Sequence, residues 1–546
     1  MLPEAWLPWA CLLLLALPSE PCPTGCDCFN RQVFCADEAL TAIPPTFPPY
    51  TTDVIFVETS FSTVPTRSFS GNPYLAKVVF LNTQLSHLGP DAFGELPLLK
   101  DLEISGNSFF NLSAAPFSSL NSLVKFTLTF NSLQTLPEDL FHQMEALEAL
   151  YLQGNQLQTL PTHLFQPLAR LKTLNLAQNL LMQLPGELFM PLGSLQSLQL
   201  SHNLLSRLPQ GAFSQLGSLR ELFLDSNGLS ELPSGLFAQL LSLERLWLHH
   251  NALSHILPST FSSLANLTHL SLLDNKLQTL PEGLFAHSPH LVALSLSHNQ
   301  LQNIPPGAFA NLSNLTSLTL SYNALTHLPA TVFSDLTELT RLYLGNNNLT
   351  ALHPTLFRNL SKLELLSLSK NHLTTLPEGI LDNNYNLLNL VLHGNPWQCD
   401  CHLTYLFRWL QQFSDRILNL QTFCAGPAYL KGQLVPDLNK EQLLCPVTRD
   451  RLGFQAPGPD DMEVGDGWDQ VAAERATQSS CTYSNPDGTM VLGCDKVQCR
   501  WLSMHLSARE GATPGLPYNA SRVWDLMSAC GNMRVTVSIE ARAGGP

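Results

Sequence analysis

Histidine is the side chain of this sequence with the most evident capacity for chemistry, because imidazole binds zinc and transfers protons near neutral pH. His142 and Glu145 have the H-x-x-E spacing by which some zinc enzymes hold their metal, and His249 and His250 are adjacent. With 17 His in the chain, about one such match is expected by chance, and no second His lies nearby in the motif. Nucleophile elbows, phosphate-binding loops and dinucleotide fingerprints are also missing from the sequence. We therefore predict no catalytic residue, no metal and no cofactor.

Thirteen cysteines form the second set of reactive side chains. Cys11 lies in an apolar N-terminal stretch, and the others fall into three groups of four, an even number that suits disulfide pairing. No His stands at ligand spacing in the first two groups, so disulfides are favoured over zinc. The three groups are Cys22, Cys26, Cys28 and Cys35; Cys399, Cys401, Cys424 and Cys445; and Cys481, Cys494, Cys499 and Cys530.

A repeat of 24 residues must position most of the other side chains. Its clearest mark is an Asn that recurs without insertion or deletion. The positions are Asn107, Asn131, Asn155, Asn179, Asn203, Asn227, Asn251, Asn275, Asn299, Asn323, Asn347, Asn371 and Asn395. Around each Asn the chain reads L-x-x-L-x-L-x-x-N-x-L and then Pro and Phe, while Thr59 and Thr83 hold the Asn position in two earlier segments. This pattern is that of a leucine-rich repeat, with about fifteen repeats over residues 50–395.

The repeat predicts an α/β-type leucine-rich repeat solenoid, curved, with a parallel sheet on its concave face. Each L-x-L pair indicates a short strand whose leucines point into the coil, and strands of successive repeats stack in parallel. The Asn amide should pair with backbone groups that the bend after each strand leaves without partners. A Phe ten residues after each Asn should pack the opposite wall, with Leu381 replacing it in the last repeat. We interpret all of these residues as structural.

Residues two, four and six positions before each Asn should face outwards from the sheet. Most of them are small, but Phe223 and Trp247 are bulky and adjacent in the stack, within a charged rim. Aromatic and Arg side chains on such a surface are typical of protein interfaces, although packing of the two rings against each other explains them equally well. The candidate partner-binding residues are Phe223, Trp247, Arg245, Glu221, Asp225, Tyr151, Tyr343 and Arg341.

Seven N-x-[ST] sequons predict N-glycosylation. They are Asn111, Asn266, Asn311, Asn314, Asn348, Asn359 and Asn519. Counted from the repeated Asn as zero, the six within repeats lie at positions 4, 15, 12, 15, 1 and 12, whereas the strand and its outward residues occupy roughly positions 17 to 23. The predicted sheet therefore carries no sequon, which leaves it free to bind a macromolecule.

Flanking segments complete the predicted organisation. In order, the segments are a secretory signal peptide (1–21), an N-terminal cysteine cap (22–49), the repeats (50–395), a C-terminal cysteine cap (396–446), an acidic Gly/Pro-rich linker (447–473) and a small disulfide-stapled β-rich module (474–546). The caps are needed because the end repeats of a solenoid expose an open leucine core. In the last module, alternating residues predict a strand over 533–539.

Composition narrows the classes of partner. The formal net charge is −15 and no run of Lys or Arg occurs, which argues against nucleic acid and anionic membranes. No stretch approaches 18 uninterrupted apolar residues, and the C-terminus lacks the hydrophobic tail of a lipid-anchor signal. We expect a secreted, soluble protein.

The order of these parts and three runs of sequence resemble the regulatory subunits of carboxypeptidase N, a group of extracellular leucine-rich repeat proteins. The runs are HGNPWQCDC at 393–401, AGPAYLKG at 425–432 and VSIEAR at 537–542. The resemblance implies a non-catalytic plasma glycoprotein that binds and stabilises a catalytic zinc carboxypeptidase, which removes C-terminal Lys or Arg from peptides. It also implies a hetero-oligomer with two copies of each subunit.

Similar caps of extracellular leucine-rich proteins imply the pairs Cys22–Cys28, Cys26–Cys35, Cys399–Cys424 and Cys401–Cys445. The four tail cysteines should then pair among themselves, in an unassigned order. Two other functions stay open from the residues alone, namely a soluble carrier of a hormone or growth factor and a soluble pattern-recognition or adhesion protein. The material that co-purifies with the native protein distinguishes these functions.

Overall fold

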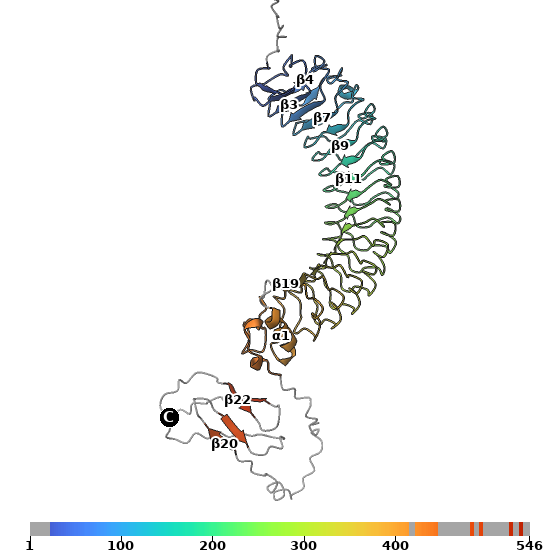
Figure 1. Cartoon of the computed structure of the whole chain (residues 1–546). Helices are drawn as coiled ribbons and strands as arrows, with labels where there is room; N and C mark the ends of the chain where they lie inside the picture. The colour runs from blue at the N-terminus through green and yellow to red at the C-terminus, as the bar shows by residue number, and fades with distance from the viewer. Residues whose placement is uncertain are drawn as a thin grey trace, which may run out of the picture. The chain divides into compact units, whose positions relative to one another are not determined.

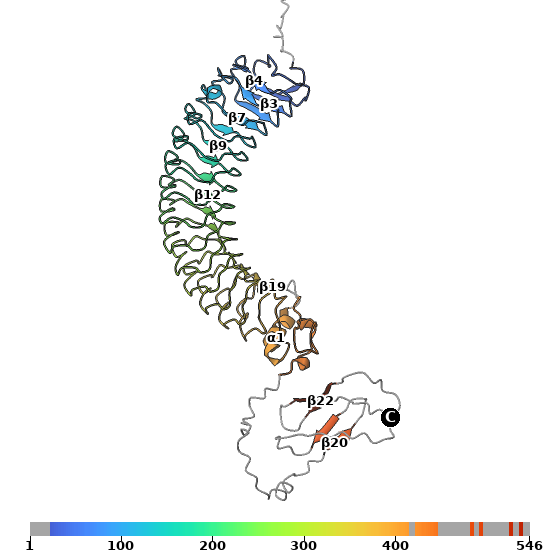
Figure 2. The ribbon, with the colours of Figure 1, turned by 180° about the vertical axis from the view of Figure 1, so that it is seen from behind.

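The computed structural model describes residues 22–413 and 421–445 and, in the remainder, four short strands. The chain divides into two compact units, Met1–Val447 and Thr448–Pro546. Fifteen strands of the first unit follow one another at intervals of 24 residues and pair in parallel along the inner side of an arc (Figure 1). The turned view shows the same row of strands from behind (Figure 2).

The strands of this sheet are short and evenly spaced. They are β3 (Asp53–Val57), β5 (Lys77–Leu81), β7 (Asp101–Ser105), β8 (Lys125–Thr127), β9 (Ala149–Tyr151), β10 (Thr173–Asn175), β11 (Ser197–Gln199), β12 (Glu221–Phe223), β13 (Arg245–Trp247), β14 (His269–Ser271), β15 (Ala293–Ser295), β16 (Ser317–Thr319), β17 (Arg341–Tyr343), β18 (Leu365–Ser367) and β19 (Asn389–Val391). Residues 24 apart lie opposite one another, as Glu221 and Arg245 do. The pair β4 (Thr63–Val64) and β6 (His87–Leu88) forms a small second sheet in the first repeats.

Leucine and phenylalanine side chains fill the coil as the repeat predicts. The central Leu of each strand from β9 onwards is buried, as Leu222 is in β12. On the opposite wall the Phe rings stack on one another with centroids 6.0–6.5 Å apart. One step differs, because Phe126 of β8 inserts its ring between Phe117 and Phe141. The core is thus one continuous hydrophobic cluster along the repeats.

The repeated Asn side chains join successive repeats through their amides. Nδ2 of Asn179 donates to the carbonyl oxygen of Leu152 in the preceding repeat at 3.0 Å. Its Oδ1 accepts the backbone N–H of Leu157 at 3.2 Å, also from the preceding repeat. Each Asn therefore pairs with buried backbone groups that would otherwise lack partners, which confirms the predicted role.

The residue before each repeated Asn takes a left-handed backbone conformation. From Phe130 to Lys370 the non-glycine residues at this position have φ between 50° and 56°, and Gly154 and Gly394 have φ of 72° and 75°. This conformation turns the chain away from the strand at the same point in every repeat.

The α/β part of the predicted fold class is wrong, because turns rather than α-helices form the convex side of the described repeats. The N–H of Leu164 bonds to the carbonyl of Pro161, and that of Leu168 to Phe165, so each bond spans three residues. A Pro recurs where a helix could begin, and few residues separate it from the next strand. Among the described repeats the outer segments contain one 3₁₀ turn, η1 (Ala115–Phe117).

Disulfide-bonded caps cover both ends of the repeats. At the N-terminal end β1 (Cys26–Phe29) and β2 (Gln32–Cys35) form a hairpin, and β2 extends the sheet by pairing with β3. At the other end lie η2 (Cys401–Leu403), α1 (Thr404–Phe413), η3 (Val435–Asp437) and η4 (Lys440–Gln442). The disulfides are Cys22–Cys28, Cys26–Cys35, Cys399–Cys424 and Cys401–Cys445, the same four pairs that the resemblance implies.

The buried Trp397 joins the C-terminal cap to the last repeat. Its side chain is fully buried, and Nε1 donates to the Leu392 carbonyl at 3.0 Å. Tyr405 of α1 accepts the N–H of Leu381 and donates to Asp382, and burial raises the pKa of its hydroxyl.

In the second unit the structure describes β20 (Cys481–Ser484) paired antiparallel with β21 (Val491–Cys494), and β22 (Val523–Met527) with β23 (Arg534–Ser538). The predicted linker lies outside the described residues.

Candidate functional site

The aromatic pair of the sheet lies where the repeat predicts it, but it is half-buried rather than fully exposed. Phe223 and Trp247 are opposite residues of β12 and β13, and their rings stack with centroids 6.2 Å apart and an interplanar angle of 15°. The packing explanation is therefore correct for their mutual contact. Part of each ring still faces outwards, and this surface remains a candidate for binding a partner.

Charged residues beside the aromatic pair are paired with one another. Nη1 of Arg245 lies 2.5 Å from Oε1 of Glu221, which is the opposite residue on β12. Arg245 is exposed, and Glu221 is half-buried.

Asp225 corrects our expectation, because it is 7% exposed rather than facing water. Its carboxylate accepts Ser201 Oγ at 2.5 Å and lies 3.5 Å from Nε2 of His249, so neighbouring repeats cover it. Burial lowers the pKa of His249, and the nearby Asp225 opposes that shift. We accordingly place Asp225 beneath the candidate surface and not on it.

The remaining candidate residues lie on the same sheet at a distance from this pair. Tyr151 of β9 is half-buried, with Nζ of Lys125 5.9 Å from its ring centroid. Four strands beyond β13, Arg341 and Tyr343 repeat the Arg-Leu-aromatic pattern of Arg245 and Trp247 on β17. The structure thus places the candidates on one sheet but gathers only Glu221, Phe223, Arg245 and Trp247 into a cluster.

Ion pairs in the repeats follow the 24-residue period. They join Arg67 to Asp91, Lys77 to Asp101, Asp101 to Lys125, Glu148 to Lys172, Arg220 to Glu244, Glu221 to Arg245, Asp225 to His249, His250 to Asp274 and Glu338 to Lys362. In-register stacking places these residues side by side. This spacing is a signal by which the pairs could have been found from the sequence.

None of the sequon residues within the described repeats lies on a strand of the sheet. Asn111, Asn266, Asn311, Asn314, Asn348 and Asn359 are all exposed. Asn519 lies outside the described residues. Glycosylation of the described sequons would leave the strands uncovered.

An open depression of ≈ 830 Å³ lies beside the sheet and not on it. It is lined by residues just before successive strands, including Arg220 and Glu244, and by the sequon residues Asn266 and Asn314. Glycans at these two positions would occupy the depression, so we do not assign it to a ligand.

The histidine motifs do not form a metal site. His142 and Glu145 are both exposed on a turn of an ordinary repeat. His250 is engaged by Asp274, with Nδ1 and Oδ2 2.6 Å apart.

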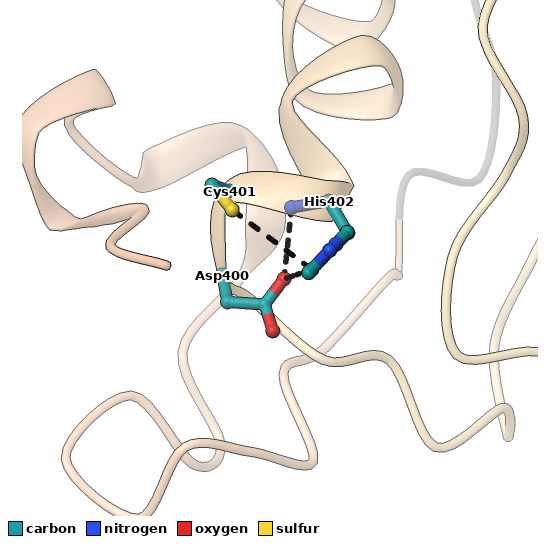
Figure 3. Close-up of side chains that lie close together, drawn as sticks. All are labelled: Asp400, Cys401 and His402. Atoms are coloured by element: carbon teal, nitrogen blue, oxygen red, sulfur yellow. Dashed lines mark hydrogen bonds and ion pairs between the residues drawn. The ribbon is translucent and has the colours of Figure 1, made fainter. Parts of the chain in front are cut away.

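Our sequence reasoning missed one cluster, since a His does adjoin a cap cysteine. Asp400, Cys401 and His402 have potential ligand atoms within 4.8 Å of one another (Figure 3). The Cys401 sulfur is bonded to Cys445, however, and is not a thiolate. Asp400 caps the 3₁₀ turn by accepting the N–H of His402, so the cluster has a structural explanation.

Within the described part of the chain, no helix has both the length and the apolar character needed to cross a membrane. The four disulfides are typical of extracellular proteins.

Comparison with known proteins gives the repeats and part of the chain a relationship. The Leucine rich repeat family model matches overlapping segments that together span residues 99–396. The chain is 67% identical over 165 residues to carboxypeptidase N subunit 2 of Homo sapiens, covering 30% of each chain. Against the Mus musculus protein it is 61% identical over 171 residues, 31% of each. The chain is therefore homologous to this subunit over that part, which spans about a third of the relatives' length.

Solved structures show a similar fold. The TLR13–ssRNA13 complex matches with a TM-score of 0.63 and 28% identity, covering 72% of this chain and 57% of that one. A Toll–Spatzle complex from Drosophila matches with a TM-score of 0.65 and 24% identity, covering 76% and 61%, which concerns the fold alone.

Proposed function

The chain belongs to the leucine-rich repeat family, and on that premise we propose that it is a secreted, non-catalytic subunit that binds and stabilises a zinc carboxypeptidase. The observation that carries the proposal is the 67% identity to carboxypeptidase N subunit 2 over 165 residues. The partner enzyme would remove C-terminal Lys or Arg from circulating peptides, as the resemblance implies. Extracellular location agrees with the disulfides of both caps.

The concave sheet is the surface that we assign to this partner. It is built on stacked repeats that change little on binding, so affinity should come from a few anchors rather than from ordering of loops. Phe223 and Trp247 offer adjoining aromatic surface, and the exposed Arg245 borders it. Aromatic and Arg residues of this kind are enriched among the residues that dominate binding energies.

A first experiment tests the partner itself. The native protein is purified from plasma under mild conditions, and the co-purifying material is identified and assayed against peptides ending in Lys or Arg. We expect a zinc carboxypeptidase in a complex of defined mass. Co-purification of a hormone or growth factor without peptidase activity would replace the proposal by the carrier function.

A second experiment tests the surface. Changing Phe223 and Trp247 together to Ala should weaken association by at least about 2 kcal/mol, roughly thirtyfold, while secretion is retained. The control changes Met190 and Leu241 to Ala, because both are exposed apolar side chains outside the sheet. A chain ending at Pro446 tests the tail. If the double variant binds normally and the truncated chain does not, the tail contains the docking module and the concave surface is the wrong assignment.

A further inference from the structure

Basic side chains on the strands of the repeats show one departure from the 24-residue pairing. The strands β3 to β19 carry four Lys or Arg residues, and three of them contact a carboxylate one repeat away. Lys77 and Lys125 lie 3.2 Å and 3.7 Å from Asp101, and Arg245 lies 2.5 Å from Glu221. The fourth, Arg341, is exposed and has no ion pair among the residues that the structure describes.

Register explains why Arg341 differs from Arg245. The two residues occupy the same position of Arg-Leu-aromatic strands, four repeats apart. Glu221 lies opposite Arg245 on the preceding strand, whereas Ser317 holds that place opposite Arg341, and Leu365 lies on its other side. Glu364 precedes β18 and forms no ion pair with Arg341 in the described structure. The fold thus presents a guanidinium without the acid that its counterpart has.

The sheet around Arg341 is basic within an acidic chain. The strands β14 to β19 contain no Asp or Glu, although the whole chain has a net charge of −15. Asp274, at the edge of this region, is already engaged by His250 at 2.6 Å. Lys370, at the same edge of the sheet, is exposed. Its neighbours 24 residues away are Asn346 and Gly394, neither of them acidic.

Space for a bound segment is also present. The side chains next to Arg341 and Tyr343 on β16 are Ser317 and Thr319, which are small and carry hydroxyl groups. Gly394 lets the stem of Lys370 lie close over the last turn, since an added Cβ would come 2.9 Å from Lys370 Cγ. Described sequon residues near this region, such as Asn348 and Asn359, lie off the strands.

We propose that the C-terminal half of the concave sheet, centred on Arg341 and bordered by Lys370, docks an acidic segment of the partner protein. A guanidinium binds a carboxylate through two parallel hydrogen bonds, which suits Glu or Asp side chains of a peptide. This inference rests on the proposed function for the identity of the partner. Four strand spacings of about 4.8 Å separate β17 from β13, so one partner can reach Arg341 and the aromatic pair across about 19 Å.

The test restores the missing acid from within the chain. Ser317→Glu places a carboxylate opposite Arg341, as Glu221 stands opposite Arg245, and should occupy the guanidinium. Ala293→Glu is the matched control, since it adds the same charge at the same strand position one repeat earlier, two strands from Arg341. Arg341→Gln removes the guanidinium itself. All variants are made in the full-length secreted glycoprotein, and their melting curves are compared with that of the wild type.

Two probes separate this inference from the proposed function. The first is a fluorescein-labelled twelve-residue peptide of alternating Glu and Ser, compared with one in which Gln replaces Glu. Fluorescence anisotropy is measured at about 0.15 M salt, where a Debye length of about 8 Å screens the distant acidic groups of the chain. The second probe is the purified zinc carboxypeptidase subunit.

We expect the wild type and Ala293→Glu to prefer the Glu peptide at least about tenfold, and Ser317→Glu and Arg341→Gln to lose that preference. The same two variants should bind the carboxypeptidase subunit at least about tenfold more weakly. Equal preference of Ser317→Glu and the wild type for the Glu peptide, or an equal loss in Ala293→Glu, would overturn the inference. Peptide discrimination without any binding of the carboxypeptidase subunit would support the acidic site and reject the proposed partner.

Discussion

Replacing Asn179 by Ala tests how the repeats are held together. Asn179 is 4% exposed and contacts the backbone of two repeats. Without its Oδ1 the buried N–H of Leu157 loses its acceptor, which costs about 1–3 kcal/mol. The carbonyl of Leu152 also accepts from Asn155, and that of Leu176 from Asn203, so both oxygens keep a donor. The expected cost is therefore that of one stranded N–H, about 1–3 kcal/mol.

Two further variants calibrate this value. Asn227 makes the same contacts but is half-buried, so water can replace part of the lost bonding and Asn227→Ala should fall near the lower end of that range. Phe223→Ala removes a half-buried ring stacked on Trp247 and should cost less than Asn179→Ala, about 1 kcal/mol.

Urea unfolding followed by circular dichroism gives the free energies, and hydrogen exchange of the peptide that contains Leu157 reports the stranded amide. That peptide should lose protection in Asn179→Ala and keep it in Phe223→Ala. Greater destabilisation by Phe223→Ala than by Asn179→Ala would refute our assignment of inward and outward positions in the repeat.

Three other outcomes follow from the same structure. The isolated chain should bind no stoichiometric zinc and cleave no peptide ending in Lys or Arg, as measured by metal analysis and a peptidase assay; activity in the pure chain would reject the non-catalytic assignment. Burial lowers the pKa of His249 below 6.5, so the unfolded state takes up a proton more readily and stability should fall as the pH drops below about 6.5. His249→Gln should flatten this part of the unfolding profile, and an unchanged profile would contradict the role of burial. The register of β20 and β21 places Cys481 opposite Cys494, so non-reducing peptide mapping should recover that pair, whereas a bond from either residue to a cap cysteine would overturn the division into domains.

Much of the fold was predictable because one residue type in each position has one physical role. The spacing of Asn predicts a bend at which buried backbone groups need a partner, and Asn179 meets that need with a donor and an acceptor. The convex side was harder to predict, because its positions require only apolar side chains facing inwards. Turns such as that from Pro161 to Leu164 satisfy this requirement as well as helices do.

The candidate surface was predictable in position but not in exposure. Alternation along a strand places Glu221, Phe223 and Asp225 on one side, yet the chain turns immediately after β12. Asp225 is consequently covered by neighbouring repeats, while Phe223 keeps part of its ring accessible. Alternation describes a straight strand, and the strands here are only three residues long from β8 onwards.

Lateral neighbours carry the information that a single repeat lacks. A side chain of this sheet meets the residues 24 positions before and after it, so the charge that it presents depends on three repeats at once. Arg245 and Arg341 are indistinguishable within their own strands, but Glu221 neutralises the first and Ser317 leaves the second unpaired. Binding specificity in such a solenoid can therefore change through one substitution on an adjacent repeat, without any change in the residue that contacts the partner.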